Sequence, residues 1–224
     1  MQNSYEITNQ KILSHTENYK HVIWDWNGTL VDDVDMAVEA VNVLLKENNL
    51  NTVCNGKYRE IFGFPVKNYY LNLGFNYDLV SFEKLCDRFI EEYNLKRATQ
   101  ATLFQGVVPL LTEIKKSKKQ SILSAAAQWH LDEITQHLNV HEFFDFKYGI
   151  ADHYASSKLQ RGRELIEVSN IDPKETIMIG DTDHDFEVAS ELGIACLLVA
   201  DGHQTHDRLT RIHDKVIHGR RVFD

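Results

Sequence analysis

The sequence predicts an α/β protein with a parallel, doubly wound sheet and an all-helical segment inserted after the first strand. From residue 106 onward, short apolar runs alternate with helical patterns, and such alternation implies right-handed crossovers between parallel strands. Between about residues 33 and 105 we find no strand pattern, whereas apolar residues recur there at helical spacing. The chain has 224 residues, enough for one core that carries a subdomain.

The elements follow from local patterns in chain order. The first 20 residues are polar and predict an N-terminal arm or short helix. Later elements are predicted at 21–24 (strand), 34–48, 57–62, 65–73 and 82–93 (helices), 106–115 (helix), 121–123 (strand), 129–138 (helix), 146–149 (strand), 158–168 (helix), 176–179 (strand), 184–192 (helix), 195–199 (strand) and 205–212 (helix). We therefore expect an arm over 1–20, a core formed by 21–32 and 106–224, and a helical insertion over 33–105.

Composition excludes several classes of protein. A formal net charge of −9 argues against sequence-independent nucleic-acid binding, which needs clustered Lys and Arg. We see no apolar stretch near the roughly 20 residues that span a bilayer and no signal-peptide pattern, so we expect no membrane association. Cys54, Cys86 and Cys196 show no metal-ligand spacing and suit reduced thiols in the cytoplasm. The sequence leaves monomer and homodimer open.

The segment that ends the first strand is the strongest candidate for chemistry. Residues 21–33 read His-Val-Ile-Trp-Asp-Trp-Asn-Gly-Thr-Leu-Val-Asp-Asp. An apolar run therefore delivers the carboxylate of Asp25 into a turn that contains Gly28. A carboxylate in this place can attack an electrophile, and glycine lets backbone N–H groups approach an anion closely.

Further polar residues follow three later elements. Ser124 ends the run Ser-Ile-Leu-Ser, Lys158 opens a helix, and Asp181 and Asp185 come after Ile-Met-Ile-Gly. Because the carboxyl ends of parallel strands share one edge of a sheet, these side chains should gather beside Asp25. Clustered carboxylates are costly without a cation, and a hard divalent ion such as Mg²⁺ relieves that cost.

In order and spacing, these motifs resemble those of the haloacid dehalogenase superfamily, whose phosphatases open with Asp-x-Asp-Gly-Thr-(Leu/Val). The resemblance covers about residues 21–200. It implies a Rossmann-like core with a parallel sheet and an α-helical cap, as in phosphoglycolate phosphatase and β-phosphoglucomutase relatives. The implied activity is Mg²⁺-dependent hydrolysis of a small phosphorylated metabolite, such as phosphoglycolate or a sugar phosphate.

The resemblance also implies a role for each motif residue. Asp25 matches the nucleophile that forms an aspartyl phosphate. Lys158 would pair with Asp25 and the transferring phosphoryl group, and Ser124 would donate a hydrogen bond to a phosphoryl oxygen. Asp181 would bind the metal directly, and Asp185 would bind it through water or support it from behind.

Further contacts are expected around these residues. The backbone carbonyl of Asn27 would be another metal ligand, which needs no particular side chain. Gly28, Thr29 and Ala125 are expected at the substrate phosphate. In the cap, we nominate Arg59 as a substrate contact, with a surface ion pair as the alternative.

Asn27 is where the chain departs from the family pattern. Its place belongs to the Asp that protonates the leaving group and then activates water, and an amide does neither near neutral pH. Three explanations stay open: an engineered trap, an enzyme of low turnover or with a reassigned acid/base, and a catalytically silent phosphometabolite-binding protein. His153 and His184, in loops beside the motifs, are the candidate replacements, whereas His203 is expected to be a surface or core residue.

Two other branches of the superfamily fit less well. The dehalogenase branch needs no metal and lacks the acidic cluster, so Asp181 argues against it. The phosphonatase branch also lacks the second Asp but uses a cap lysine as a Schiff base, for which Lys57 and Lys67 are the candidates. Each is more simply a surface lysine.

Overall fold

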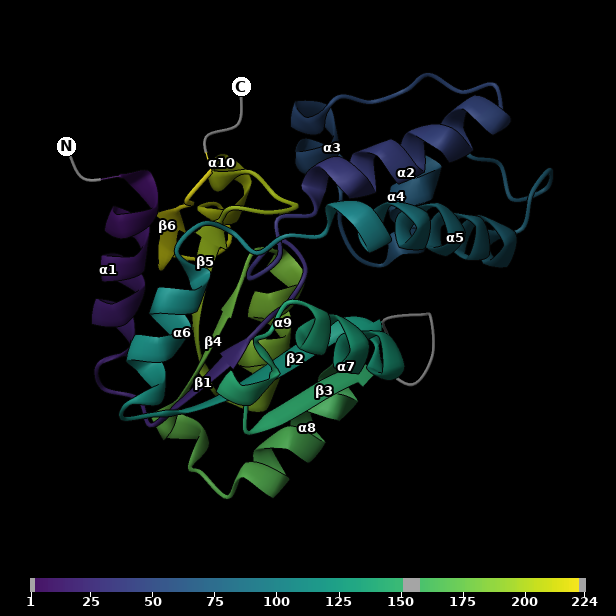
Figure 1. Ribbon diagram of the computed structural model, residues 1–224. Coiled ribbons are helices and arrows are strands. Elements are labelled where there is room, and N and C mark those ends of the chain that lie inside the picture. The colour runs from purple at the N-terminus through teal and green to yellow at the C-terminus, as the bar shows by residue number, and fades with distance from the viewer. Residues whose placement is uncertain (1–2, 151–157, 222–224) are drawn as a thin grey trace.

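The computed structural model describes residues 3–150 and 158–221 and confirms the α/β class. Its six parallel strands lie in the order β3-β2-β1-β4-β5-β6 (Figure 1). They are β1 (His21–Trp24), β2 (Lys119–Ala127), β3 (Phe146–Ile150), β4 (Thr176–Gly180), β5 (Ala195–Ala200) and β6 (Val216–His218). The chain adds β2 and β3 on one side of β1, and then β4, β5 and β6 on the other side, so the strand order reverses between β1 and β4. Ligands bind at such switch points, beyond the carboxyl ends of the strands.

Helices cover both faces of this sheet. They are α1 (Ser4–Thr16), α6 (Val107–Lys115), α7 (Gln128–His137), α8 (Lys158–Ser169), α9 (Asp183–Leu192) and α10 (His206–Leu209), with 3₁₀ turns at His141–Phe143 and Pro173–Glu175. Apolar residues of α1, α6 and α7 pack in one cluster and those of α8, α9 and α10 in another. Figure 1 shows α1 beside α6, and α8 and α9 on the opposite face.

The central strand β1 explains why the two clusters form. All four of its residues are buried, and successive side chains of a strand point to opposite faces. Val22 and Trp24 therefore join the cluster under α1 and α6, while Ile23 joins the cluster under α8 and α9. The indole N–H of Trp24 donates to Gln120 Oε1 over 3.0 Å, so burial leaves no unpaired donor on this ring.

The structure corrects several predicted boundaries. The N-terminal residues form the 13-residue helix α1, and its buried Ile12 packs in the core. Strand β2 extends past the predicted 121–123, and its pairing with β3 shifts register between Leu123 and Ala127. Helix α10 is shorter than the predicted 205–212, and the edge strand β6 was not predicted, because three residues are too few to show a period.

The inserted segment contains four helices with a hydrophobic core of their own. These are α2 (Val34–Glu47), α3 (Asn55–Ile61), α4 (Val66–Asn72) and α5 (Phe82–Gln100), which lie to one side of the sheet in Figure 1. The two connections to the sheet pair with each other, since Asp32 N donates to Thr102 O over 2.9 Å and Phe104 N donates to Leu30 O over 3.0 Å. We propose on this basis the division into a core (21–32 and 106–224) and a cap (33–105). Within the described residues, every helix is too short or too polar to cross a membrane.

Candidate active site

The turn after β1 holds the predicted nucleophile at the switch point. The backbone N–H of Asp25 donates to Ile179 O over 2.8 Å, so it continues the pairing with β4. The side chain of Asp25 is buried. Three residues on, Gly28 has φ 74°, and a Cβ there would lie 2.4 Å from Asp181 Oδ2 and 2.7 Å from the His203 ring. Only glycine lets the turn come this close to Asp181.

Lys158 joins two of the predicted carboxylates. At the start of α8, its Nζ lies 2.5 Å from Asp25 Oδ1 and 2.7 Å from Asp185 Oδ1, and its side chain is buried. Burial alone would lower the pKa of Lys158, but Asp185 and Asp25 raise it well above its usual value. The ammonium therefore stays charged and offsets much of the repulsion between the two carboxylates.

The acidic cluster contains Asp25, Asp181 and Asp185, each of which places a carboxylate oxygen within 4.8 Å of the others. Burial raises the pKa of Asp25 to about 6, and it raises the pKa of Asp181 well above its usual range. For Asp185 burial acts the same way, but Lys158 together with the hydrogen bond from Thr182 and the charge of His184 outweighs it, and the pKa falls. Two buried carboxylates therefore lack enough positive charge around them, which is the condition that favours a hard cation.

Asp185 differs from Asp181 in how fully its oxygens are paired. Asp185 Oδ1 accepts from Lys158, while Oδ2 accepts the hydroxyl of Thr182 at 2.7 Å and two backbone N–H groups. It also completes the capping box of α9. Asp181 accepts Thr29 Oγ1 at 3.0 Å and the N–H of His203 at 2.6 Å. Asp181 thus has the freer oxygens for a direct ligand, and Asp185 suits a supporting place.

Most of the predicted site residues line one small cavity of about 90 Å³. Ser124, at the end of β2, is buried, and its Oγ accepts the N–H of Ala126 at 3.0 Å. Thr29 is buried beside the cavity and also lies 3.4 Å from Asp25 Oδ2. The predicted residues that line the cavity are Asp25, Asn27, Ser124, Ala125, Lys158, Asp181 and Asp185.

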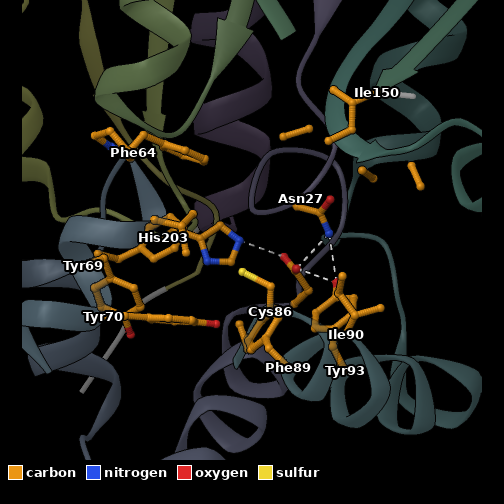
Figure 2. Close-up of a pocket in the computed structure, with 18 of the residues that line it drawn as sticks. Asn27, Phe64, Tyr69, Tyr70, Cys86, Phe89, Ile90, Tyr93, Ile150 and His203 are labelled. Carbon is orange, nitrogen blue, oxygen red and sulfur yellow. Dashed lines mark hydrogen bonds and ion pairs between the residues drawn. The ribbon is translucent and has the colours of Figure 1, made fainter. Parts of the chain in front are cut away.

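Asn27 takes part in a hydrogen-bonded network rather than pointing freely into the site (Figure 2). Its Nδ2 donates to Asp33 Oδ2 and to the Tyr93 hydroxyl, both over 2.9 Å, and Tyr93 donates to Asp33 over 2.6 Å. A carboxylate only accepts hydrogen bonds, so the network fixes which end of the amide faces Asp33. The amide at this position is therefore held by both hydrogens on its nitrogen.

Sequence reasoning missed the pair formed by Asp33 and His203. His203 Nε2 lies 3.3 Å from Asp33 Oδ1, and Nδ1 lies 2.9 Å from the Tyr58 hydroxyl. Burial lowers the pKa of His203, but Asp33 and Asp181 outweigh it and bring the pKa to about 9. The only sequence signal was position, since His203 follows β5 at the edge of the sheet where the motifs meet and Asp33 precedes a helix.

Arg59, which was predicted to contact the substrate, binds backbone carbonyls after β5 instead. Its Nε donates to Gly202 O over 2.6 Å, and Nη2 donates to the carbonyls of Ala200 and Gln204 over 3.1 and 3.0 Å. Arg59 lines neither of the two cavities at this site. Its place favours an anchor between helix α3 of the cap and the loop after β5.

The candidate proton donors and Schiff-base lysines are also dispersed. The His184 ring stacks on Phe64 with centroids 4.5 Å apart and lines neither cavity, and His153 lies outside the described residues. Lys57 is exposed, 3.5 Å from Glu60. Lys67 is exposed as well but lines a larger cavity next to the site.

Comparison with known proteins places this site in a family. The family model for haloacid dehalogenase-like hydrolases matches residues 22–199. A phosphoglycolate phosphatase from Caulobacter vibrioides is 25% identical over 91% of this chain and 89% of its own length. A 5′-nucleotidase from Pseudomonas aeruginosa is 22% identical over 85% of this chain and 87% of its own.

A solved structure shows that the fold agrees as well. A haloacid dehalogenase-like hydrolase from Streptococcus pneumoniae superposes with a TM-score of 0.78 at 23% identity, covering 90% of this chain and 94% of its own. The predicted superfamily, its phosphoglycolate phosphatase-like branch and the class of phosphoric monoester hydrolase are confirmed. The chain belongs to the haloacid dehalogenase-like hydrolase family.

Proposed function

We propose that this protein hydrolyses a small phosphate monoester through an aspartyl phosphate on Asp25, with Mg²⁺ bound beside it. The observation that carries the proposal is the buried arrangement of Asp25, Lys158 and Asp181 at the switch point of the sheet. It supplies a carboxylate nucleophile, a fixed cation and a carboxylate with open lone pairs within one small cavity.

The residues divide the work of phosphoryl transfer. An oxygen of Asp25 attacks phosphorus, and the bond to the ester oxygen breaks. Lys158 keeps the Asp25 carboxylate ionised and oriented, since its Nζ contacts Oδ1 at 2.5 Å, and it balances negative charge on the phosphoryl oxygens during transfer. The Ser124 hydroxyl lines the same cavity and would donate a hydrogen bond to those oxygens. The N–H of Gly28, also expected at the phosphate, instead donates to Asp33 Oδ1 over 2.8 Å.

The acidic cluster fits Mg²⁺ by the chemistry of its donors. Asp25 and Asp181 would be direct ligands, with the carbonyl of Asn27 as the third. Asp185 would not bind the ion directly; it accepts a hydrogen bond from Lys158 and completes the capping box at the N-terminus of α9. Bound there, Mg²⁺ would neutralise charge on the phosphoryl group and bring it near the nucleophile. The raised pKa values of Asp25 and Asp181 support this assignment.

The amide of Asn27 favours a second candidate function. Because Asn27 cannot protonate a leaving group, the site could bind a phosphorylated metabolite without turning it over. We place slow turnover first, because Asp25 and Lys158 are both present and, among the described residues, Lys158 forms ion pairs only with Asp25 and Asp185 of the site itself. The reading as an engineered trap predicts the same slow chemistry.

Phosphate release distinguishes the two functions. The purified chain is assayed with 2-phosphoglycolate, glucose 6-phosphate and 4-nitrophenyl phosphate, with and without Mg²⁺. We expect Mg²⁺-dependent release that Asp25→Asn abolishes, while the exposed control Asp78→Asn leaves it unchanged. Ligand binding without release or a phosphoenzyme would establish the silent binding protein instead.

A further inference from the structure

A second, larger cavity adjoins the catalytic one and lies between the cap and the sheet. It has a volume of about 320 Å³, and Asn27, Phe62, Phe64, Ala125 and His203 line both cavities. For scale, an apolar cavity of about 150 Å³ holds a benzene molecule. We call the larger cavity the aromatic chamber, because rings from α3, α4 and α5 form much of its wall (Figure 2).

The chamber offers little to a charged or sugar-like substrate. Lys67, which is exposed, is the one lysine among its lining residues, and no arginine lines it within the described chain. Burial lowers the pKa of His130 to about 4, so that ring is neutral, and the charge of His203 is paired with Asp33. A glycolate carboxylate or a ring of sugar hydroxyls would meet mainly rings and aliphatic carbons there, and burying unpaired polar groups is costly.

Two polar atoms in the chamber wall lack a partner. The hydroxyl of Tyr69 and Oδ1 of Asn94 are buried and make no hydrogen bond with the described residues. Such atoms are uncommon in folded proteins and often mark a place where a ligand or water binds.

Resting on the proposed function, we propose that the substrate is an aryl phosphate, a monoester of a substituted phenol whose ring occupies the aromatic chamber while its phosphate reaches Asp25. The chamber joins the catalytic cavity at Asn27 and His203. Aromatic rings prefer offset or edge-to-face partners, and Phe62 and Phe64 already meet edge to face with centroids 5.6 Å apart at this junction.

The chemistry of Asn27 leads independently to the same class. Asp25 forms an oxygen–phosphorus bond, the bond from phosphorus to the phenolic oxygen breaks, and the electron pair leaves on the phenolate. A phenol has a pKa of about 10, against about 15.7 for water, which an aliphatic alcohol resembles. The phenolate therefore departs without a proton from residue 27 and takes one from solvent. Water then attacks phosphorus, releasing Asp25 and inorganic phosphate, with its proton passing to solvent.

Four esters separate recognition of the ring from departure of the leaving group. Phenyl phosphate has both a ring and a phenolate, benzyl phosphate has a ring on an alcohol, and 2-phosphoglycolate and glucose 6-phosphate have neither. We expect KM for the two ring-bearing esters to be at least tenfold below that for the others. We expect kcat/KM for phenyl phosphate, which reports phosphoryl transfer to Asp25, to exceed that for benzyl phosphate by about 10²–10⁴, the usual contribution of a general acid.

A filling substitution tests the chamber directly. Ile90→Trp on α5 occupies part of it, and Leu95→Trp on the same helix is the matched control, because Leu95 is 69% exposed and does not line the chamber. The first should raise KM for both ring-bearing esters about tenfold, and the second should leave it unchanged. Circular dichroism and the unfolding midpoint establish that each variant is folded.

The outcomes keep the two proposals apart. Hydrolysis with equal or better kcat/KM for 2-phosphoglycolate, glucose 6-phosphate or adenosine 5′-monophosphate overturns the aryl phosphate and leaves the phosphatase standing. An unchanged KM in a folded Ile90→Trp also overturns it. If none of the esters is hydrolysed and no phosphoenzyme forms, the proposed function and this inference fail together.

Discussion

Replacing Asn27 with aspartate probes the site most directly, because the structure gives the new carboxylate a defined neighbour. The nitrogen of Asn27 lies 2.9 Å from Asp33 Oδ2, so an aspartate there would place two carboxyl groups side by side. Two charges about 4 Å apart repel by about 4 kcal/mol at an effective dielectric constant of about 20, or about three pKa units. His203, 3.3 Å from Asp33, offsets part of this repulsion.

We therefore expect the new carboxyl group in Asn27→Asp to titrate at about pH 5–7, one to three units above a free aspartate. A group of that pKa is a competent general acid near neutrality, so turnover of benzyl phosphate should rise by about 10²–10⁴. For phenyl phosphate, kcat/KM, which reports phosphoryl transfer to Asp25, should rise less, because its leaving group needs no proton. Steady-state rates for both esters from pH 4 to 9 measure the change.

The same variant should show a matching change in stability. A carboxyl group whose pKa is higher in the folded state binds more protons there, so its contribution falls as pH rises. Relative to wild type, Asn27→Asp should lose stability from about pH 4 upward until the new group is fully ionised. Adding Asp33→Asn removes the like charge and should abolish the slope. If the unfolding midpoints of wild type and Asn27→Asp change with pH in parallel, the predicted proximity of the carboxyl groups at positions 27 and 33 is refuted. If benzyl phosphate turnover is unchanged, residue 27 is not the position of the proton donor.

Three further predictions follow from other contacts. Mg²⁺ should raise the unfolding midpoint of wild type but not of Asp181→Ala, as measured by calorimetry, and an equal rise in both would remove the metal site from the acidic cluster. Arg59→Met should speed proteolysis at 31–36 and 101–106 about tenfold or more, since it breaks three hydrogen bonds between cap and core. In wild type, a metal fluoride should slow the same cleavage if the cap closes as a lid. The pKa of His21 falls from 6.5 to about 4 on burial, so about 3 kcal/mol of stability should be lost as pH falls from 6.5 to 4, and unfolding of His21→Gln by urea at several pH values should show a smaller loss.

The sequence predicted those parts of the fold that local periodicity encodes. Strand β1 was predicted at its exact bounds, because four consecutive buried residues precede a turn. Strand β6 and the length of β2 were missed for a physical reason: both depend on pairing with a neighbouring strand, which a short stretch of sequence does not reveal. Helix α1 likewise owes its place to packing, since its buried Ile12 joins the main cluster although the helix is polar overall.

The order of the motifs predicted the acidic cluster and Lys158, because the carboxyl ends of parallel strands lie at one edge of the sheet. The role of Arg59 was beyond such reasoning. Its partners are backbone carbonyls after β5, more than 140 residues away along the chain. Residue type alone does not distinguish a guanidinium that binds substrate from one that binds the protein's own backbone.

Asp33 and His203 show what separates a list of motif residues from a working site. Asp33 accepts hydrogen bonds from Gly28 N at 2.8 Å, from Asn27 and from Tyr93, and it also faces His203. One carboxylate therefore holds the turn after the nucleophile, the amide in the acid/base position and a histidine from beyond β5. An aspartate at position 27 would have to share this acceptor-only partner, whereas the amide donates one N–H to Asp33 and the other to the Tyr93 hydroxyl. The surroundings of residue 27 thus suit asparagine, whose neutral amide donates both of its N–H groups, and this is why the consequences of its replacement should appear in stability as well as in rate.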